Sequence, residues 1–190
     1  MRLYRVFPHD PAARAGRPGH PLFLHHGQTV GRWDNARLYA TWYLSFSAAG
    51  AVGESFGNLG TWTDAMFETP FLPGAHRALG VFEVPDETPL IDLDDARVLA
   101  ERDVHPSQVV IRDIAFTQPF AARVFAETDA RGARRWAGIR WWSYHRPVWR
   151  NAALFDTPDA PAPVTLSAVE PLDLDHPAVR EAARMLLRTL

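Results

Sequence analysis

The chain has 190 residues, of which 47% are hydrophobic and 12% aromatic, and its formal net charge is −2. This length can bury a core but is too short for two full domains, so one compact domain is expected. The balanced charge provides no basic excess for nucleic acid or anionic membranes, and the absence of cysteine excludes disulfides and thiolate chemistry.

The sequence predicts neither a secretion signal at the N-terminus nor a membrane span. Met1 to Arg5 lacks the apolar core of a secretion signal. No apolar run approaches the roughly 20 residues that a membrane span requires. A cytoplasmic protein is therefore expected, without direct contact with membranes or nucleic acid.

The first predicted element is a short strand. Leu3 to Phe7 alternates apolar and polar residues and is followed by Pro8, which predicts a strand that stops early. From Pro8 to Gly27 the chain is rich in Pro, Gly and His, as is typical of a long surface loop with a binding role.

A strand and a helix of small residues are expected next. Arg37 to Tyr43 is rich in strand formers. Ser47 is a good N-cap for a helix over Ala48 to Phe56, and Gly57 is a natural stop. The alanines and glycines of this helix favour close packing of backbone or ligand.

The rest of the chain interleaves short strands and helices. Apolar runs predict strands over Ala78 to Val84, Pro89 to Leu93, Trp136 to Trp142, Ala152 to Phe155 and Val164 to Val169. Helical spacing predicts helices over Asp94 to Arg102, Phe116 to Thr128 and His176 to Leu190. The expected fold class is mixed α/β (α+β), with a mixed sheet in a single compact domain.

Two arginines are candidates for gripping phosphate. Arg32 lies between Gly31 and Trp33, so an aromatic neighbour can hold its planar fork while it donates two hydrogen bonds. Its alternative is an ion pair with Asp34 or with another carboxylate. Arg5 shares a strand face with apolar residues, where a charge must be paired or bind a ligand.

Glu54 and Tyr39 are the other candidates in the first half. Glu54 lies among apolar neighbours at the end of the small-residue helix. Such a carboxylate can stabilise the oxocarbenium-like centre formed when a glycosidic bond breaks; the alternative is a solvated glutamate. Tyr39 is either a core tyrosine or a platform for a nicotinamide or adenine ring.

Two polar residues follow later between apolar runs. Ser143 ends a strand, where it would either hold a ribose or carboxamide or bond to the backbone. Asn151 precedes the next strand. The histidines lack metal-ligand spacing, so no metal is expected. No glycine-rich phosphate loop is present, which leaves arginines and local backbone to bind a nucleotide.

Several short motifs share their order and spacing with one known family. They are Leu-Tyr-Arg-Val from Leu3, Gly-Arg-Trp-Asp from Gly31, Ala-x-x-Glu ending at Glu54, and Gly-Ile-x-x-x-Ser ending at Ser143, before Asn151. With these motifs the chain resembles the RES-domain family over roughly Leu3 to Asp156. The resemblance implies an ADP-ribosyltransferase-like fold, with residues 1–156 as the catalytic domain and 157–190 as a strand and helix packed on it.

The resemblance also implies a function. RES domains are toxins of toxin–antitoxin pairs that consume NAD by hydrolysis or phosphorolysis, or transfer ADP-ribose to protein. Arg5 and Arg32 would grip NAD, Tyr39 would position the nicotinamide side, Glu54 would be the principal catalytic residue, and Ser143 with Asn151 would line the pocket. The implied partner is an Xre-type helix-turn-helix antitoxin that blocks the active site.

The chain departs from the family at one position. Family members commonly have Gly-Gly-Arg-Trp-Asn, whereas this chain has Val30-Gly31-Arg32-Trp33-Asp34. An ion pair between Asp34 and Arg32 would weaken phosphate binding. Two alternatives to an NAD glycohydrolase or phosphorylase therefore stay open: a protein ADP-ribosyltransferase and a non-catalytic binding module.

Overall fold

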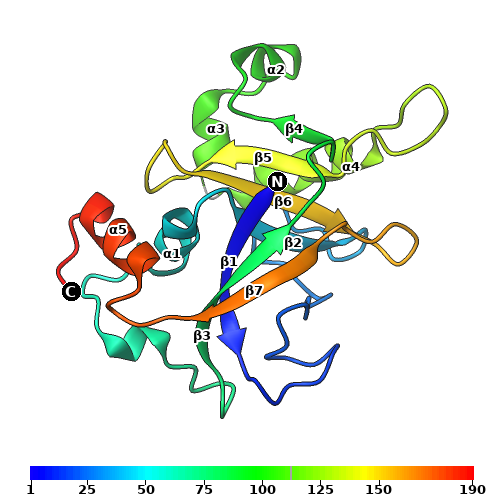
Figure 1. The fold of residues 1–190 in the computed structure, drawn as a ribbon. Coiled ribbons are helices and arrows are strands. Elements are labelled where there is room, and N and C mark those ends of the chain that lie inside the picture. Colours follow the sequence, from blue (N-terminus) through cyan, green and yellow to red (C-terminus); the bar gives the residue numbers. More distant parts are fainter. Residues whose placement is uncertain (112) are drawn as a thin grey trace. The chain divides into compact units, whose positions relative to one another are not determined.

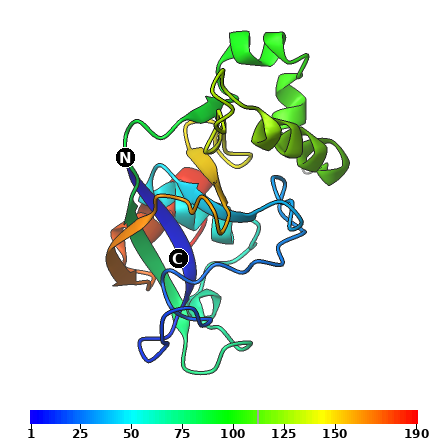
Figure 2. The same ribbon diagram turned by 90° about the vertical axis from the view of Figure 1, so that its right-hand side faces the viewer.

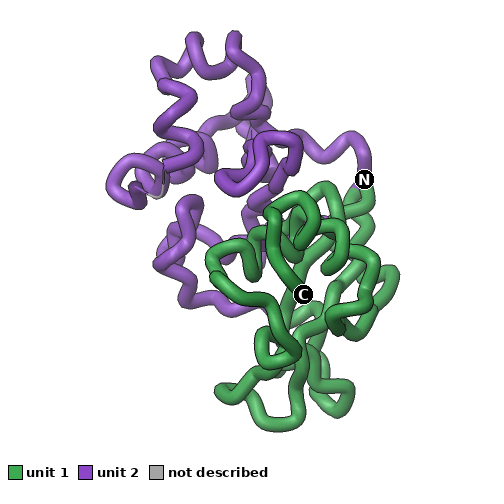
Figure 3. The backbone as a smooth tube through the Cα atoms, turned by 90° about the vertical axis from the view of Figure 1, so that its left-hand side faces the viewer, with its two compact units in different colours: residues 1–23, 44–84, 164–190 green, residues 24–43, 85–163 purple. Residues whose placement is uncertain are grey.

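The computed structural model describes residues 1–111 and 113–190. The chain divides into two compact units, coloured separately in Figure 3. Unit 1 consists of residues 1–23, 44–84 and 164–190, and unit 2 of residues 24–43 and 85–163. No helix among the described residues is long and apolar enough to cross a bilayer.

The antiparallel strands of unit 1 lie in the order β1-β3-β7, and β2 (Ala40–Ser45) is the neighbour of β1 on its other side. β1 (Arg2–His9) pairs with β3 (His76–Glu83) along its full length, and β3 pairs with β7 (Thr165–Pro171). The prediction that the first strand stops before Pro8 is wrong. Pro8 lies opposite Arg77, and the pairing with β3 continues to His9.

Helix α1 (Ala48–Phe56) begins and ends where its local signals predict. The Ser47 side chain accepts a hydrogen bond from Gly50 N at 3.0 Å, and Gly57 is the C-cap. α1 packs against β1 and against α5 (Pro177–Leu186), beside which it lies in Figure 1. The 3₁₀ helix η1 (Asp64–Phe67) is an element that the sequence patterns did not predict.

The strands of unit 2 make the sheet mixed. β4 (Leu90–Asp92) is parallel to β5 (Gly138–Trp142), and β5 is antiparallel to β6 (Arg150–Asp156). The strand order in this unit is β4-β5-β6-β2. β2 (Ala40–Ser45) runs from unit 2 into unit 1, where Ser45 lies opposite Tyr4. The predicted α+β class with a mixed sheet is confirmed.

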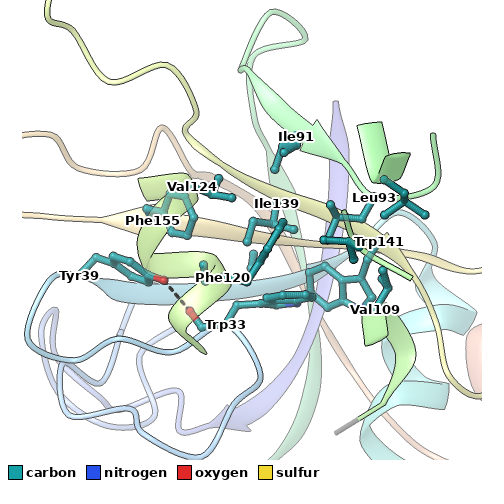
Figure 4. Close-up of a cluster of buried hydrophobic side chains, with 14 residues drawn as sticks. Trp33, Tyr39, Ile91, Leu93, Val109, Phe120, Val124, Ile139, Trp141 and Phe155 are labelled. Carbon is teal, nitrogen blue, oxygen red and sulfur yellow. Dashed lines mark hydrogen bonds between the residues drawn. The ribbon is translucent and has the colours of Figure 1, made fainter. Parts of the chain in front are cut away.

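Three helices belong to unit 2 and lie together as the green helices of Figure 2. They are α2 (Ala96–Glu101), α3 (Pro106–Val110) and α4 (Ile114–Ala126). Their apolar residues pack with β5 and β6 around an aromatic core, of which Trp33, Phe120 and Trp141 are the centre (Figure 4). α3 is a second element that the sequence patterns did not predict.

The segment before β2 is irregular. Residues 10–39 contain turns and an isolated bridge between Asn35 and Tyr39, but no helix or longer strand. The strand predicted from Arg37 therefore begins later, at Ala40. Tyr39 precedes the strand because its backbone N–H donates to Asn35 O at 3.0 Å and closes a turn.

Candidate active site

Arg5 lies in the middle of β1, on the face that carries Leu3 and Phe7. Both neighbours on this face are buried, at 0% and 4% exposure. The residue opposite Arg5 in β3 is Gly80, where an added Cβ would lie 2.5 Å from the Phe82 ring. Partial burial among these groups lowers the pKa of Arg5 to about 10, and the guanidinium keeps its charge at neutral pH.

Glu54 lies in the last turn of α1, the helix that packs on β1. Glu54 is half-buried; it follows the buried Gly53 and precedes the exposed Ser55. The small residues of α1 bring this helix close to its neighbours, as the sequence predicts. Arg5 and Glu54 thus belong to unit 1, on a strand and on the helix that packs against it.

Arg32 belongs to unit 2 and lies against two indole rings. Its Cζ is 5.4 Å from the ring centroid of Trp141 and 5.9 Å from that of Trp33, within the range of a cation–π interaction. Its Nη1 donates to Val109 O at 2.8 Å and to Val110 O at 3.2 Å. These carbonyls end α3, where the helix dipole also favours a cation.

Asp34 directs its carboxylate to the loop around Arg32. Oδ2 accepts a hydrogen bond from Gly31 N at 2.6 Å, and Oδ1 accepts one from the Tyr43 hydroxyl at 2.9 Å. The Tyr43 oxygen also accepts from Trp33 N at 2.9 Å. Asp34 is only 3% exposed, so these hydrogen bonds meet the need of a buried carboxylate for partners.

Tyr39 is part of the core of unit 2, at 4% exposure. Its ring centroid lies 4.4 Å from that of Phe155 and 4.8 Å from that of Phe125. The hydroxyl donates to Trp33 O at 2.8 Å, drawn as a dashed line in Figure 4, and accepts from Asn35 Nδ2. Burial raises the pKa of this phenol, which keeps it a donor. Tyr39 therefore supports the residue after Arg32.

Ser143 and Asn151 flank the turn between β5 and β6. Ser143 is buried, and its hydroxyl accepts from His145 N at 3.0 Å, which shapes that turn. Asn151 is also buried and lies opposite Trp141 in the β5–β6 pairing. Trp141 thus has Arg32 against its ring and Asn151 as its strand partner. The role of both polar residues in a pocket stays a prediction.

The structure assembles the candidates into two groups. Unit 1 holds Arg5 and Glu54, and unit 2 holds Arg32, Tyr39, Ser143 and Asn151. Reasoning from sequence missed the groups that fix the Arg32 loop: Asp34 and Tyr43 as hydrogen-bonded partners, the carbonyls that end α3, and Gln118 of α4, which donates to Thr29 O and Gly31 O. Among the described residues, no group of three or more His, Asp or Glu side chains is placed to hold a metal ion.

Comparisons with known proteins identify both family and fold. A model of the RES domain matches residues 2–175. The fold is similar to that of a chain in the crystal structure of the M. tuberculosis MbcT–MbcA toxin–antitoxin complex, with a TM-score of 0.60, 17% identity, and coverage of 90% of this chain and 84% of that one. No curated protein matches the chain in sequence.

Proposed function

Because this chain belongs to the RES-domain family, we propose that it is an NAD-consuming enzyme that cleaves the bond between nicotinamide and ribose. In this proposal it is the cytoplasmic toxin of a toxin–antitoxin pair, and its partner is an Xre-type antitoxin. Residues 1–156 carry the catalytic machinery, and residues 157–190 support it through β7 and α5. The toxin–antitoxin complex with a similar fold supports an antitoxin as the partner; its Xre type rests on the family resemblance.

The observation that supports the proposal most strongly is the fixed guanidinium of Arg32. Two indole rings and two α3 carbonyls hold it in unit 2. A cation that is ordered before the ligand arrives loses little entropy on binding. The planar fork of arginine also matches the oxygens of a phosphate. Arg32 is accordingly assigned to the NAD diphosphate, and Arg5 supplies a second cation.

Glu54 is assigned to the chemical step. When the C–N bond to ribose breaks, nicotinamide leaves with the electron pair and the ribosyl carbon develops positive charge. A carboxylate at that carbon stabilises the charge. An oxygen of water or phosphate then forms the new bond to that carbon, and the proton of water is released to solvent. The other candidates hold the substrate and its loop in place.

The direct test is incubation of the purified protein with NAD, with and without phosphate. We expect release of free nicotinamide, together with ADP-ribose in water or ADP-ribose-1″-phosphate in phosphate buffer. Intact NAD in both buffers would contradict the proposal. A labelled protein band with NAD labelled in its adenylate half would instead indicate ADP-ribose transfer to a side chain, the alternative that shares the first bond cleavage.

A non-catalytic binding module was the remaining alternative, and it depended on Arg32 being tied to Asp34. The carboxylate oxygens of Asp34 accept hydrogen bonds from Gly31 N and from the Tyr43 hydroxyl. Expression in a bacterial host distinguishes the two functions. An active toxin arrests growth, and co-expression of its antitoxin restores growth, whereas a binding module leaves growth unchanged.

A further inference from the structure

We propose that Asp34 is a positioning residue that fixes the backbone on both sides of Arg32 and so presents the guanidinium to the diphosphate; this rests on the proposed function. An acid beside a phosphate-binding arginine would by itself disfavour an anionic substrate. The contacts of Asp34 give its carboxylate a different task.

Asp34 connects to both neighbours of Arg32. Oδ2 accepts directly from Gly31 N at 2.6 Å. Oδ1 accepts from the Tyr43 hydroxyl, whose oxygen accepts from Trp33 N, so that Tyr43 relays the second connection. The backbone N–H groups before and after Arg32 are therefore both held by one buried acid and one phenol.

The carbonyls on each side of Arg32 are held as well. Gly31 O accepts from Gln118 Nε2 at 3.0 Å and from Asp34 N at 3.2 Å. Trp33 O accepts from the Tyr39 hydroxyl. With all four flanking backbone groups bonded, the segment from Gly31 to Trp33 has one preferred path. Arg32 then needs little reorganisation when it binds an anion.

The close approach requires glycine at position 31. An added Cβ would lie 2.3 Å from the Tyr43 hydroxyl oxygen and 2.8 Å from Asp34 Oδ2. Real Cβ atoms do not tolerate such distances to atoms that are themselves fixed by hydrogen bonds. Gly31 is consequently needed for this hydrogen-bond arrangement, since any larger residue would displace Asp34 or Tyr43.

The donors around Asp34 also explain why an acid can occupy the position. Gly31 N–H and the Tyr43 hydroxyl are both donors, and a carboxylate offers two acceptor oxygens, whereas an amide offers one acceptor and one donor. Asparagine can accept from Gly31 N–H with Oδ1, and its Nδ2 can then only donate to the Tyr43 oxygen, whose hydroxyl would turn away. Burial and the charge of Asp34 raise the pKa of Tyr43, so this phenol stays protonated and keeps donating.

The test uses three variants and a matched control. Asp34→Ala removes both acceptors, Asp34→Asn keeps one, and Tyr43→Phe removes the relay. Asp129→Ala is the control, because Asp129 also accepts from backbone amides in unit 2, in the turn at Arg131 and Ala133. For each protein we would measure kcat and KM for NAD, together with hydrogen exchange of the Gly31 and Trp33 amides.

Asp34→Ala should raise KM for NAD by about tenfold to a hundredfold with a smaller change in kcat, since a displaced arginine weakens substrate binding. Both amides should exchange faster in Asp34→Ala, and the Trp33 amide alone in Tyr43→Phe. Asp34→Asn and the control should stay within about threefold of the wild type in KM, a margin of less than 1 kcal/mol.

Unchanged exchange of both amides in Asp34→Ala, or a wild-type KM in that variant, would overturn the positioning role. A purely structural role would lower the amount of folded enzyme and leave KM as it was. If the wild-type protein leaves NAD intact, the proposed function fails, and the exchange measurement still decides whether Asp34 fixes the loop.

Discussion

The Arg32 guanidinium and the Val109 carbonyl are 77 positions apart in the sequence and meet at 2.8 Å. Val109 is in the last turn of α3, which the sequence patterns did not predict. This contact gives Arg32 a neutral acceptor at the end of a helix, which helps to fix its guanidinium.

The planar fork of Arg32 should not be replaceable by lysine. Arg32→Lys keeps the charge but loses the two-pronged geometry and the stacking on Trp141. We expect KM for NAD to rise by about tenfold or more. Arg37→Lys, an exposed arginine five residues later, is the control and should bind NAD as the wild type does. Equal KM values in the two variants would remove Arg32 from the binding site.

The hydroxyl of Tyr39, which donates to Trp33 O in the loop around Arg32, should also contribute to the free energy of unfolding. Tyr39→Phe keeps the ring between Phe125 and Phe155 but leaves the Trp33 carbonyl without its donor. The free energy of unfolding should fall by about 1–3 kcal/mol, the cost of an unsatisfied buried polar group. Tyr144→Phe, at an exposed tyrosine, should change it by less than about 0.5 kcal/mol. Denaturant titration of both variants measures the difference.

Glu127 makes the stability of the protein sensitive to acid. Its carboxylate accepts two hydrogen bonds from Arg102 and one from the Trp136 indole, and these hold its pKa below the usual range. Because the folded-state pKa is lowered, this stabilisation is present above the unfolded value of about 4.3 and is lost as the pH falls below it.

Glu127→Gln should therefore lower the stability at pH 7 by about 2 kcal/mol and have less effect near pH 3. Melting temperatures of wild type and variant across this range provide the measurement. Glu101→Gln, at an exposed position of α2, is the control. A constant difference between wild type and Glu127→Gln at all pH values would refute the assignment.

Ser47 caps the helix that carries Glu54, and its contribution to the free energy of unfolding can be measured without an activity assay. Ser47→Ala removes the acceptor of Gly50 N and should lower the free energy of unfolding by about 1 kcal/mol. Ser55→Ala in the same helix removes only a bond back to Ala51 O, which contributes little or nothing. Chemical denaturation of the pair tests this, and equal stabilities would show that Ser47 does not cap α1.

The parts of the fold with local signals were predictable from sequence. Helix α1 has its bounds set by Ser47 and Gly57, and the prediction of these bounds is confirmed. The strand over Pro8 was not predictable, because its pairing with β3, about seventy residues later, decides it. Helix α3 carried readable signals in Pro106 at its start and Gln108, which accepts from His105 N; these are typical of a helix N-terminus.

The sequence allowed the candidate residues to be chosen by type, but it predicted few of their contacts. The expected aromatic support of Arg32 is present, and Trp141 adds a second ring from a distant strand. The environment of Asp34 depends on Tyr43, which faces it only once the loop turns back on β2. No local pattern encodes that contact. The roles of the six candidate residues in NAD cleavage remain predictions of the family resemblance.

The central claim is that Glu54 drives cleavage of the nicotinamide–ribose bond, and nicotinamide release from NAD tests it most directly. The comparison is between wild type, Glu54→Gln and the control Glu181→Gln, an exposed glutamate of α5. We predict that Glu54→Gln releases nicotinamide at least about a hundredfold more slowly than the wild type. The melting temperature of this variant should be unchanged, and the control should release nicotinamide at the wild-type rate. Equal rates in wild type and Glu54→Gln would contradict the account.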